Sequence, residues 1–321
     1  MSQRLLVTGG SGFVGRALVE GALKRGMMVN VSSRQSPKSI YPNMKHFFAN
    51  NIDLTTDWKQ ELNNVQYVVH CAGRAHVIND KASDPLALFR KVNVDGTLNL
   101  ARQAAESGVK RFIFISSVGV NGAKTTNNSS FKESDDPKPH NAYALSKWEA
   151  EKGLFDISDT TDMEIVIIRP PLIYGLDAPG NFGLLMRAIL SGWPMPLGGI
   201  KNSRSFVAIN ALVDFIFTCM FHPNAKNQIF LVSDDNDIST SDLFISLSRA
   251  AGIRNNIFSV PLWLLKLGAL LAGKSNMIQS LCGTLKLDIS KAKNTLGWRP
   301  PNLFNQGIDL TIRKSKKNKF F

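Results

Sequence analysis

Two side chains that can share a proton lie four residues apart in the segment YALSK, residues 143–147. Residues at this spacing share one face of a helix, and the breakers Pro137 and Pro139 place the helix start just before them. A free tyrosine titrates near ~10, and an ammonium ~4 Å away at an effective dielectric of ~20 contributes about 4 kcal/mol, or up to ~3 pKa units. Beside Lys147, Tyr143 is therefore predicted to exchange protons near neutral pH.

A serine pair ends an apolar run about 26 residues upstream of the tyrosine. Ser116 and Ser117 close RFIFISSV (111–118), which predicts a buried strand. A hydroxyl at that strand end can hydrogen-bond a substrate oxygen whose charge changes as hydride moves. The serines strengthen the prediction that Tyr143 and Lys147 are functional, because a tyrosine and a lysine four residues apart are by themselves a weak signal.

The segment TGGSGFVG, residues 8–15, follows a strand-like run and opens a helix-like one. This context turns a glycine pattern into a dinucleotide-binding signature, in which backbone N–H groups at the helix start attract phosphate charge. Gly9 allows the tight turn, Gly12 lets the backbone approach a pyrophosphate, and Gly15 lets helix and strand pack closely. The cofactor-binding residues predicted here are Gly9, Gly12, Phe13, Val14 and Gly15.

The second strand indicates which dinucleotide is bound. It ends Val31-Ser32-Ser33-Arg34, where NAD-preferring sites usually carry an acid for the ribose 2′-OH. With no carboxylate to repel a 2′-phosphate and Arg34 able to pair with one, NADP(H) is favoured over NAD(H). The alternative is that Arg34 is merely solvated.

Strands and helices alternate through the first half of the chain. Strands are expected at 4–8, 27–34, 65–73, 111–118 and 164–170, with helices at 13–26, 86–106 and 143–155. Alternation of this kind predicts an α/β fold, a doubly wound parallel sheet of the Rossmann type with helices on both faces. After a Gly/Pro-rich stretch at 176–183, a helix at 212–221 and a strand at 228–233 are expected to return to the sheet, and residues 234–321 are expected to be mostly helical.

The glycine loop, the Ser-Ser strand end, YALSK and the later IRPPLIYG (168–175) resemble the extended short-chain dehydrogenase/reductases, in the nucleotide-sugar epimerase/dehydratase branch. The resemblance implies that Tyr143 is the general acid/base, that Lys147 binds the nicotinamide ribose and lowers the tyrosine pKa, and that Ser117 polarises the sugar oxygen. It also implies a dinucleotide-binding domain of residues 1–178 and 205–233, with a smaller nucleotide-sugar-binding lobe of residues 179–204 and 234–321.

The same resemblance implies further contacts. Cofactor contacts are expected from Asp53, Leu54, Cys71, Ala72, Gly73, Asn93, Ser116, Pro170 and Leu172, and substrate contacts from Asn181, Pro196, Leu197 and Arg204. Simpler roles remain open, since Asp53 can cap a helix, Asn93 can be solvated and Arg204 can be a lone surface arginine. The family often places a second phosphate-binding arginine shortly before the DISKA-like segment, where this chain has only Lys286.

The residues after the catalytic serine restrict the reaction. Sugar 4,6-dehydratases of this family carry Asp-Glu there, because eliminating water needs a separate acid and base, whereas this chain has Val118-Gly119. The remaining reactions are 4-epimerisation and reduction of a 4-keto sugar. VVHCAGRAHVIND (68–80) resembles enzymes that act on UDP-N-acetyl-6-deoxyhexosamines in bacterial surface-polysaccharide pathways, and Arg34 favours the reductase. The alternative is a catalytically idle NADP(H)-binding regulator or scaffold.

Composition and charge set the remaining expectations for the 321 residues. Lys+Arg 38 against Asp+Glu 25 gives a net charge of +13, which favours anionic partners such as a UDP-sugar, and no nucleic-acid motif is present. Three widely separated cysteines predict neither a metal site nor a disulfide. No leader is seen and the apolar run 261–272 is too short to span a bilayer, so a cytoplasmic protein without stable membrane insertion is expected. The family resemblance implies a homodimer paired through the helices near 99–108 and 143–155.

Overall fold

The computed structural model describes residues 3–36, 39, 41–49, 51–75, 84–126, 128–175, 177–254, 256–271, 281–301, 304, 306–309 and 312. Within these residues the centre is a seven-stranded sheet of order β3-β2-β1-β4-β5-β6-β9, and each neighbouring pair is parallel. The strands are β1 (Arg4–Thr8), β2 (Met28–Ser33), β3 (Met44–Phe48), β4 (Tyr67–His70), β5 (Arg111–Ile115), β6 (Glu164–Arg169) and β9 (Gln228–Leu231). The predicted doubly wound sheet is confirmed.

The central strands are continuous apolar runs because helices cover both faces of the sheet. All five residues of β5 are buried, whereas the edge strand β3 has none that is fully buried. β1 has β2 on one side and β4 on the other, so the strand order reverses there. In open α/β sheets a ligand binds beyond the carboxyl ends of the strands at such a switch point.

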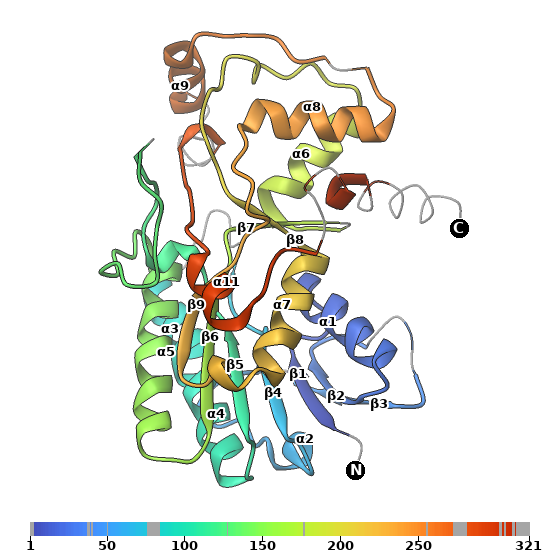
Figure 1. The fold of residues 1–321 in the computed structure, drawn as a ribbon, viewed down its shortest axis with the longest axis vertical. Helices are drawn as coiled ribbons and strands as arrows, with labels where there is room; N and C mark the ends of the chain where they lie inside the picture. Colours follow the sequence, from blue (N-terminus) through green and yellow to red (C-terminus); the bar gives the residue numbers. More distant parts are fainter. Residues whose placement is uncertain are drawn as a thin grey trace.

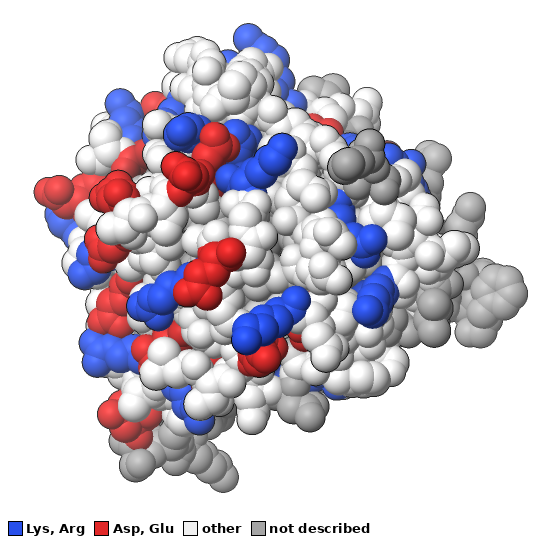
Figure 2. Space-filling model, turned by 90° about the horizontal axis from the view of Figure 1, so that it is seen from below, with Lys and Arg blue, Asp and Glu red and all other residues white. Residues whose placement is uncertain are grey.

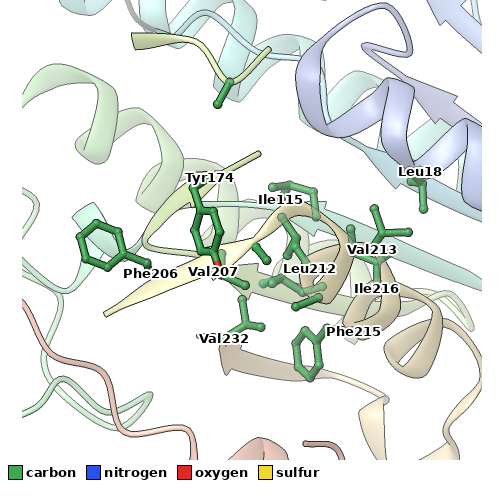
Figure 3. Close-up of a cluster of buried hydrophobic side chains, with 14 of the residues drawn as sticks. Leu18, Ile115, Tyr174, Phe206, Val207, Leu212, Val213, Phe215, Ile216 and Val232 are labelled. Atoms are coloured by element: carbon green, nitrogen blue, oxygen red, sulfur yellow. The ribbon is translucent and has the colours of Figure 1, made fainter. Parts of the chain in front are cut away.

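Figure 1 shows the two helical layers. One face carries α1 (Phe13–Lys24) and α7 (Ile209–Phe221), and the other carries α2 (Lys59–Leu62), α3 (Pro85–Arg90), α4 (Gly96–Glu106) and α5 (Ala142–Asp159). The buried side chains divide accordingly, with Leu18 and Phe215 in one apolar cluster and Leu100 and Leu154 in the other. Figure 3 shows the first cluster, where side chains of α7 gather with Ile115 and Val232.

The predicted single helix over 86–106 is interrupted. A π-helical turn, Lys91–Asp95, separates α3 from α4. Such insertions are rare and occur frequently at functional sites. Here the turn carries Asn93, which is completely buried. The edge strand β3 is a second difference, because its half-exposed residues give no apolar run to detect.

A smaller part of the chain lies beyond the carboxyl ends of the strands (Figure 1). It contains α6 (Gly180–Leu190), α8 (Thr240–Ala251) and α9 (Leu262–Leu271), while α11 (Ser290–Leu296) packs near β9. The parallel pair β7 (Leu172–Tyr174) and β8 (Phe206–Ala208) lies between the two parts. At this junction the Tyr174 hydroxyl donates to Asp234 Oδ2 at 2.6 Å, and burial raises the pKa of Asp234 to about 6.

Candidate active site

The glycine loop after β1 has the backbone shape that its residue types predict. Gly9 has φ +68°, and a Cβ there would lie 2.8 Å from the backbone nitrogen of Ala72. A Cβ at Gly15 would lie 2.2 Å from the Gly9 carbonyl oxygen. Both positions therefore require glycine, Gly9 for its left-handed conformation and Gly15 for close packing.

The start of α1 is suited to a pyrophosphate. Gly12 is the N-cap without a capping side chain, and the first turn carries no acidic residue. Among the described residues, a Cβ on Gly12 would meet only the Gly9 carbonyl oxygen, at 3.1 Å. Nearby, the buried Ser32 hydroxyl has no hydrogen-bond partner among the described residues. These features fit a dinucleotide, whose phosphates would lie against Gly12, Phe13 and Val14.

The segment after β4 joins the glycine loop to α5. A Cβ on Gly73 would lie 3.0 Å from Asn93 Oδ1 and 3.7 Å from Lys147 Nζ. Asn93 accepts from the Arg74 backbone N–H at 2.8 Å and donates to the Ser146 hydroxyl at 3.0 Å. Asn93 therefore links the segment after β4 to α5. This structural role was not predicted from the sequence. Burial raises the pKa of the Cys71 thiol to about 12, so this thiol is inert.

The two serines at the end of β5 have different partners. Ser116 is buried and donates to Glu151 Oε1. Ser117 accepts from the Gly119 backbone N–H at 3.1 Å and caps the 3₁₀ turn Val118–Val120. A side chain at Gly119 would meet both the Ser117 hydroxyl and Ala144, each at 3.3 Å. Ser117 thus lies beside the first turn of α5, which also carries Tyr143.

Tyr143 and Lys147 lie on α5 as predicted, with Asn141 as the N-cap accepting from the Ala144 N–H at 2.8 Å. The predicted lowering of the tyrosine pKa is wrong for the protein without ligand, because burial raises the pKa of Tyr143 to about 12. Lys147 Nζ lies 4.1 Å from the centre of the Phe114 ring, and burial lowers the lysine pKa to about 8. Desolvation of the phenol therefore exceeds any attraction from the ammonium.

A buried ion pair supports α5 from beneath, and it was not predicted from the sequence. Arg169 at the end of β6 donates to Glu151 of α5 at 2.5 Å, and the two side chains are 2% and 3% exposed. Arg169 also donates to Asn121 Oδ1 at 3.0 Å. Glu151 lies four residues after Lys147, on the same face of α5, and its carboxylate raises the lysine pKa against the effect of burial. The four-residue spacing between Lys147 and Glu151 is the sequence signal that could have indicated a functional role for Glu151.

The remaining predicted cofactor residues lie at the same edge of the sheet or near it. Arg34 follows β2 directly and is exposed. Asp53 accepts from the Thr55 N–H at 3.0 Å, so it closes a local turn, and Leu54 beside it is exposed. Pro170 follows β6, and its carbonyl accepts from the Val118 N–H at 3.0 Å. Leu172 opens β7.

The four predicted substrate residues lie in the helical part of the chain. Arg204 is largely buried, donates to the Gly283 carbonyl at 2.7 Å and has its pKa lowered by burial to about 10, so it is not a solvated surface residue. Leu197 is buried in the apolar core, and Pro196 beside it is half-buried. Asn181 is in α6, and its side chain lies outside the described part of the chain.

A pH dependence follows from the Lys147 ammonium, whose pKa in the folded chain is about 8 rather than 10.5. The charge is present below that pH and lost above it. If Lys147 binds the nicotinamide ribose, affinity for NAD⁺ should fall about tenfold between about pH 7 and about pH 9, the size of a lost charged hydrogen bond. Calorimetric titration across this range measures the effect. Lys147→Met should bind weakly with a flat profile, and an equally flat wild-type profile would contradict the assignment.

The fold and the glycine loop define a Rossmann-type dinucleotide-binding protein. The segment that meets Gly9 also reaches Lys147 on α5, the helix that carries Tyr143. The model of the NAD-dependent epimerase/dehydratase family matches residues 5–233. The chain belongs to this family, whose members are enzymes.

Two relatives and two solved structures extend this result. UDP-glucose 4-epimerase from Vibrio cholerae is 46% identical, covering 98% of this chain and 95% of the relative. N-acetyl-alpha-D-glucosaminyl-diphospho-ditrans,octacis-undecaprenol 4-epimerase from Escherichia coli O157:H7 is 28% identical over the same shares.

In structure, the chain resembles Thermotoga maritima UDP-glucose 4-epimerase with UDP-glucose, at TM-score 0.77 and 22% identity over 99% of this chain and 100% of the other. It also resembles Bordetella bronchiseptica WbmG with NAD, at TM-score 0.78 and 20% identity over 99% and 95%. These likenesses confirm the fold. No helix among the described residues is long and apolar enough to cross a membrane.

Proposed function

We propose that this enzyme transfers hydride at C4 of a UDP-linked sugar and acts as a UDP-sugar 4-epimerase. The observation that supports the proposal is the position of Lys147, whose Nζ would lie 3.7 Å from a Cβ on Gly73, in the segment whose Cys71 and Ala72 meet Gly9. Tyr143 lies one turn before Lys147 on α5, and Ser117 lies beside the first turn of that helix. The 46% identity to the Vibrio cholerae UDP-glucose 4-epimerase supports this reaction. It also weighs against the idle regulator or scaffold considered from the sequence.

Each catalytic side chain has one task in this reaction. Bound NAD supplies the acceptor and donor of hydride. Tyr143 Oη removes the proton of the C4 hydroxyl when the sugar is oxidised and returns a proton to that oxygen when it is reduced. Ser117 donates a hydrogen bond to the same oxygen, and Lys147 holds the cofactor ribose and supplies positive charge near the phenol. With Val118 and Gly119 in place of an acidic pair, elimination of water has no second acid.

Reduction of a UDP-4-keto-6-deoxyhexosamine is the second candidate reaction, and Arg34 favours it. This exposed arginine follows β2, where an acid would select NAD(H). A reductase exchanges NADPH at every turnover, whereas an epimerase retains its cofactor through the cycle. In either reaction Asn181, Pro196, Leu197 and Arg204 are proposed to border the nucleotide, with Arg204 pairing with the diphosphate.

Changing Arg34 to Asp tests the cofactor preference. If Arg34 faces the adenosine ribose, the 2′-phosphate gains a contact of about 1.5–3 kcal/mol, or about 10- to 150-fold in affinity. Arg34→Asp should then invert the preference towards NAD(H), because the new carboxylate repels the phosphate and accepts from the 2′-OH. Titrating both proteins with both cofactors measures this. A wild type that already binds NAD(H) more tightly would make Arg34 a solvated side chain and remove its support for the reductase.

We also propose that the protein forms a homodimer through α4 and α5, which lie side by side on one face of the sheet (Figure 1). Pairing these two helices with their symmetry mates gives a four-helix bundle. Light scattering at micromolar concentration should give twice the chain mass of 35.4 kDa. A monomer mass under these conditions would contradict the proposal.

A substrate panel distinguishes the two reactions. UDP-glucose and UDP-N-acetylglucosamine with NAD⁺ should give their 4-epimers without lasting change in absorbance at 340 nm if the enzyme is an epimerase. UDP-4-keto-6-deoxyhexosamines with NADPH should instead give stoichiometric loss of that absorbance if it is a reductase. A protein that binds cofactor but converts neither class would be the idle regulator.

A further inference from the structure

The helix α9 exposes an apolar face that the sugar chemistry does not use. Its exposed leucines and tryptophan lie at positions 262, 263, 264, 267, 270 and 271, and Trp263 and Leu271 are 65% and 82% exposed. At 3.6 residues per turn these six positions span about 200° of the helix surface. Such contiguous exposed apolar area on a soluble domain marks an interaction site.

Two further exposed aromatic side chains lie on a pair of segments, one of which leads into α9. Trp193 is 67% exposed and Phe258 is 48% exposed. Their segments are paired, since the Met195 N–H donates to the Asn256 carbonyl at 2.9 Å and the Phe258 N–H donates to the Met195 carbonyl at 3.0 Å. Phe258 lies only four residues before α9. We call these exposed side chains the lobe patch: Trp193, Phe258, Leu262, Trp263, Leu264, Leu267, Leu270 and Leu271.

The two sequence segments that carry the lobe patch contain basic but no acidic residues. Residues 178–213 and 243–287 contain no aspartate or glutamate and eight lysines and arginines. The eight are Arg187, Lys201, Arg204, Arg249, Arg254, Lys266, Lys274 and Lys286. Arg187, Arg249 and Arg254 are exposed. The face at the opposite end of the molecule carries acidic and basic side chains side by side (Figure 2).

We propose that the lobe patch binds peripherally to the surface of an anionic lipid bilayer. Apolar side chains with tryptophan enter the interface, and surrounding cations are attracted to anionic headgroups. A second copy of this chain is a poorer occupant, because it would bring the same basic, acid-free segments against the first. The ten residues of α9 extend only about 15 Å, so the helix lies on the bilayer rather than across it.

Sedimentation with sucrose-loaded vesicles tests the proposal on the full chain. Vesicles of phosphatidylcholine with about 30% phosphatidylglycerol should bind the protein at least about tenfold more tightly than vesicles of phosphatidylcholine alone. This difference in affinity should shrink in about 0.5 M salt. Trp263→Ser with Leu267→Ser should weaken binding to the anionic vesicles about tenfold or more. Arg249→Gln with Arg254→Gln should weaken it without affecting the residual binding to neutral vesicles.

A matched control is Phe48→Ser, which removes an aromatic side chain of the same 65% exposure from β3 and should leave vesicle binding unchanged. NAD⁺ affinity should be unchanged in the α9 and arginine variants, which shows that they fold. Equal binding to both vesicle types, no binding, or equal loss in Phe48→Ser would overturn the proposal. An oligomer that dissociates only in the α9 variant, without lipid, would overturn it in favour of a second copy.

Discussion

Tyr143→Phe is expected to lower turnover by at least about 10²-fold, the size of a lost general acid/base. The substitution removes only the phenolic oxygen and its proton, so the ring keeps its edge contact with Phe89, whose centroid lies 6.1 Å away. Cofactor affinity should therefore stay nearly unchanged. Steady-state kinetics on the converted UDP-sugar, with calorimetric titration of the cofactor, measure both quantities.

The tyrosine pKa gives this experiment a second readout. Burial raises the pKa of Tyr143 to about 12 in the chain alone, so the phenol is protonated at neutral pH before ligands bind. Titration of tyrosine absorbance in the free protein should show one fewer high-pH phenol in Tyr143→Phe. Near-wild-type turnover by this variant, with chemistry still rate-limiting, would exclude Tyr143 as the acid/base.

Breaking the buried ion pair beneath α5 should produce the largest loss of stability. Replacing Glu151 with leucine leaves the Arg169 guanidinium, 2% exposed, without its carboxylate partner. Removal of one partner from a buried pair costs about 3–5 kcal/mol of unfolding free energy. Chemical denaturation with and without NAD⁺ measures the loss. Glu151→Leu combined with Arg169→Leu should recover part of it, because no uncompensated charge remains.

The same helix offers a control for this prediction. Arg90 donates to Glu149 at 2.6 Å, but these side chains are 48% and 21% exposed. Glu149→Gln should therefore change the unfolding free energy by at most about 1 kcal/mol. If Glu151→Leu costs no more than Glu149→Gln, burial of the inner pair does not govern the stability of α5. Glu151→Gln should also lower the Lys147 pKa below about 8, which shifts the pH dependence of NAD⁺ affinity to lower pH.

Local chemistry made much of the fold and part of the site predictable. The glycine loop and β5 follow from the backbone freedom of glycine and from a continuous apolar run, both of which are properties of short segments. The positions of Tyr143 and Lys147 on one helix follow from their spacing. These features need no knowledge of what packs against them.

Other features depend on distant parts of the chain and left little local signal. Glu151 resembles a charged residue on a helix surface until β6 brings Arg169 beneath it, 18 residues away in sequence. Asn93 was expected from family resemblance, but its contacts with Arg74 and Ser146 depend on the π-helical turn. The pKa of Tyr143 was predicted too low, because the sequence spacing indicates that the Lys147 ammonium is near but does not indicate that the phenol is desolvated.

The path of the hydrogen at C4 tests the central claim most directly. In the first experiment, UDP-glucose and UDP-N-acetylglucosamine deuterated at C4 are incubated with the protein and NAD⁺. In the second, UDP-4-keto-6-deoxyhexosamines are incubated with the protein and NADPH deuterated at the transferred position. The products of both are analysed by NMR. Hydride transfer at C4 predicts a product that carries deuterium at C4, as the 4-epimer in the first case or the reduced sugar in the second. Loss of the C4 deuterium to solvent, or no product from either class while cofactor is bound, would contradict it.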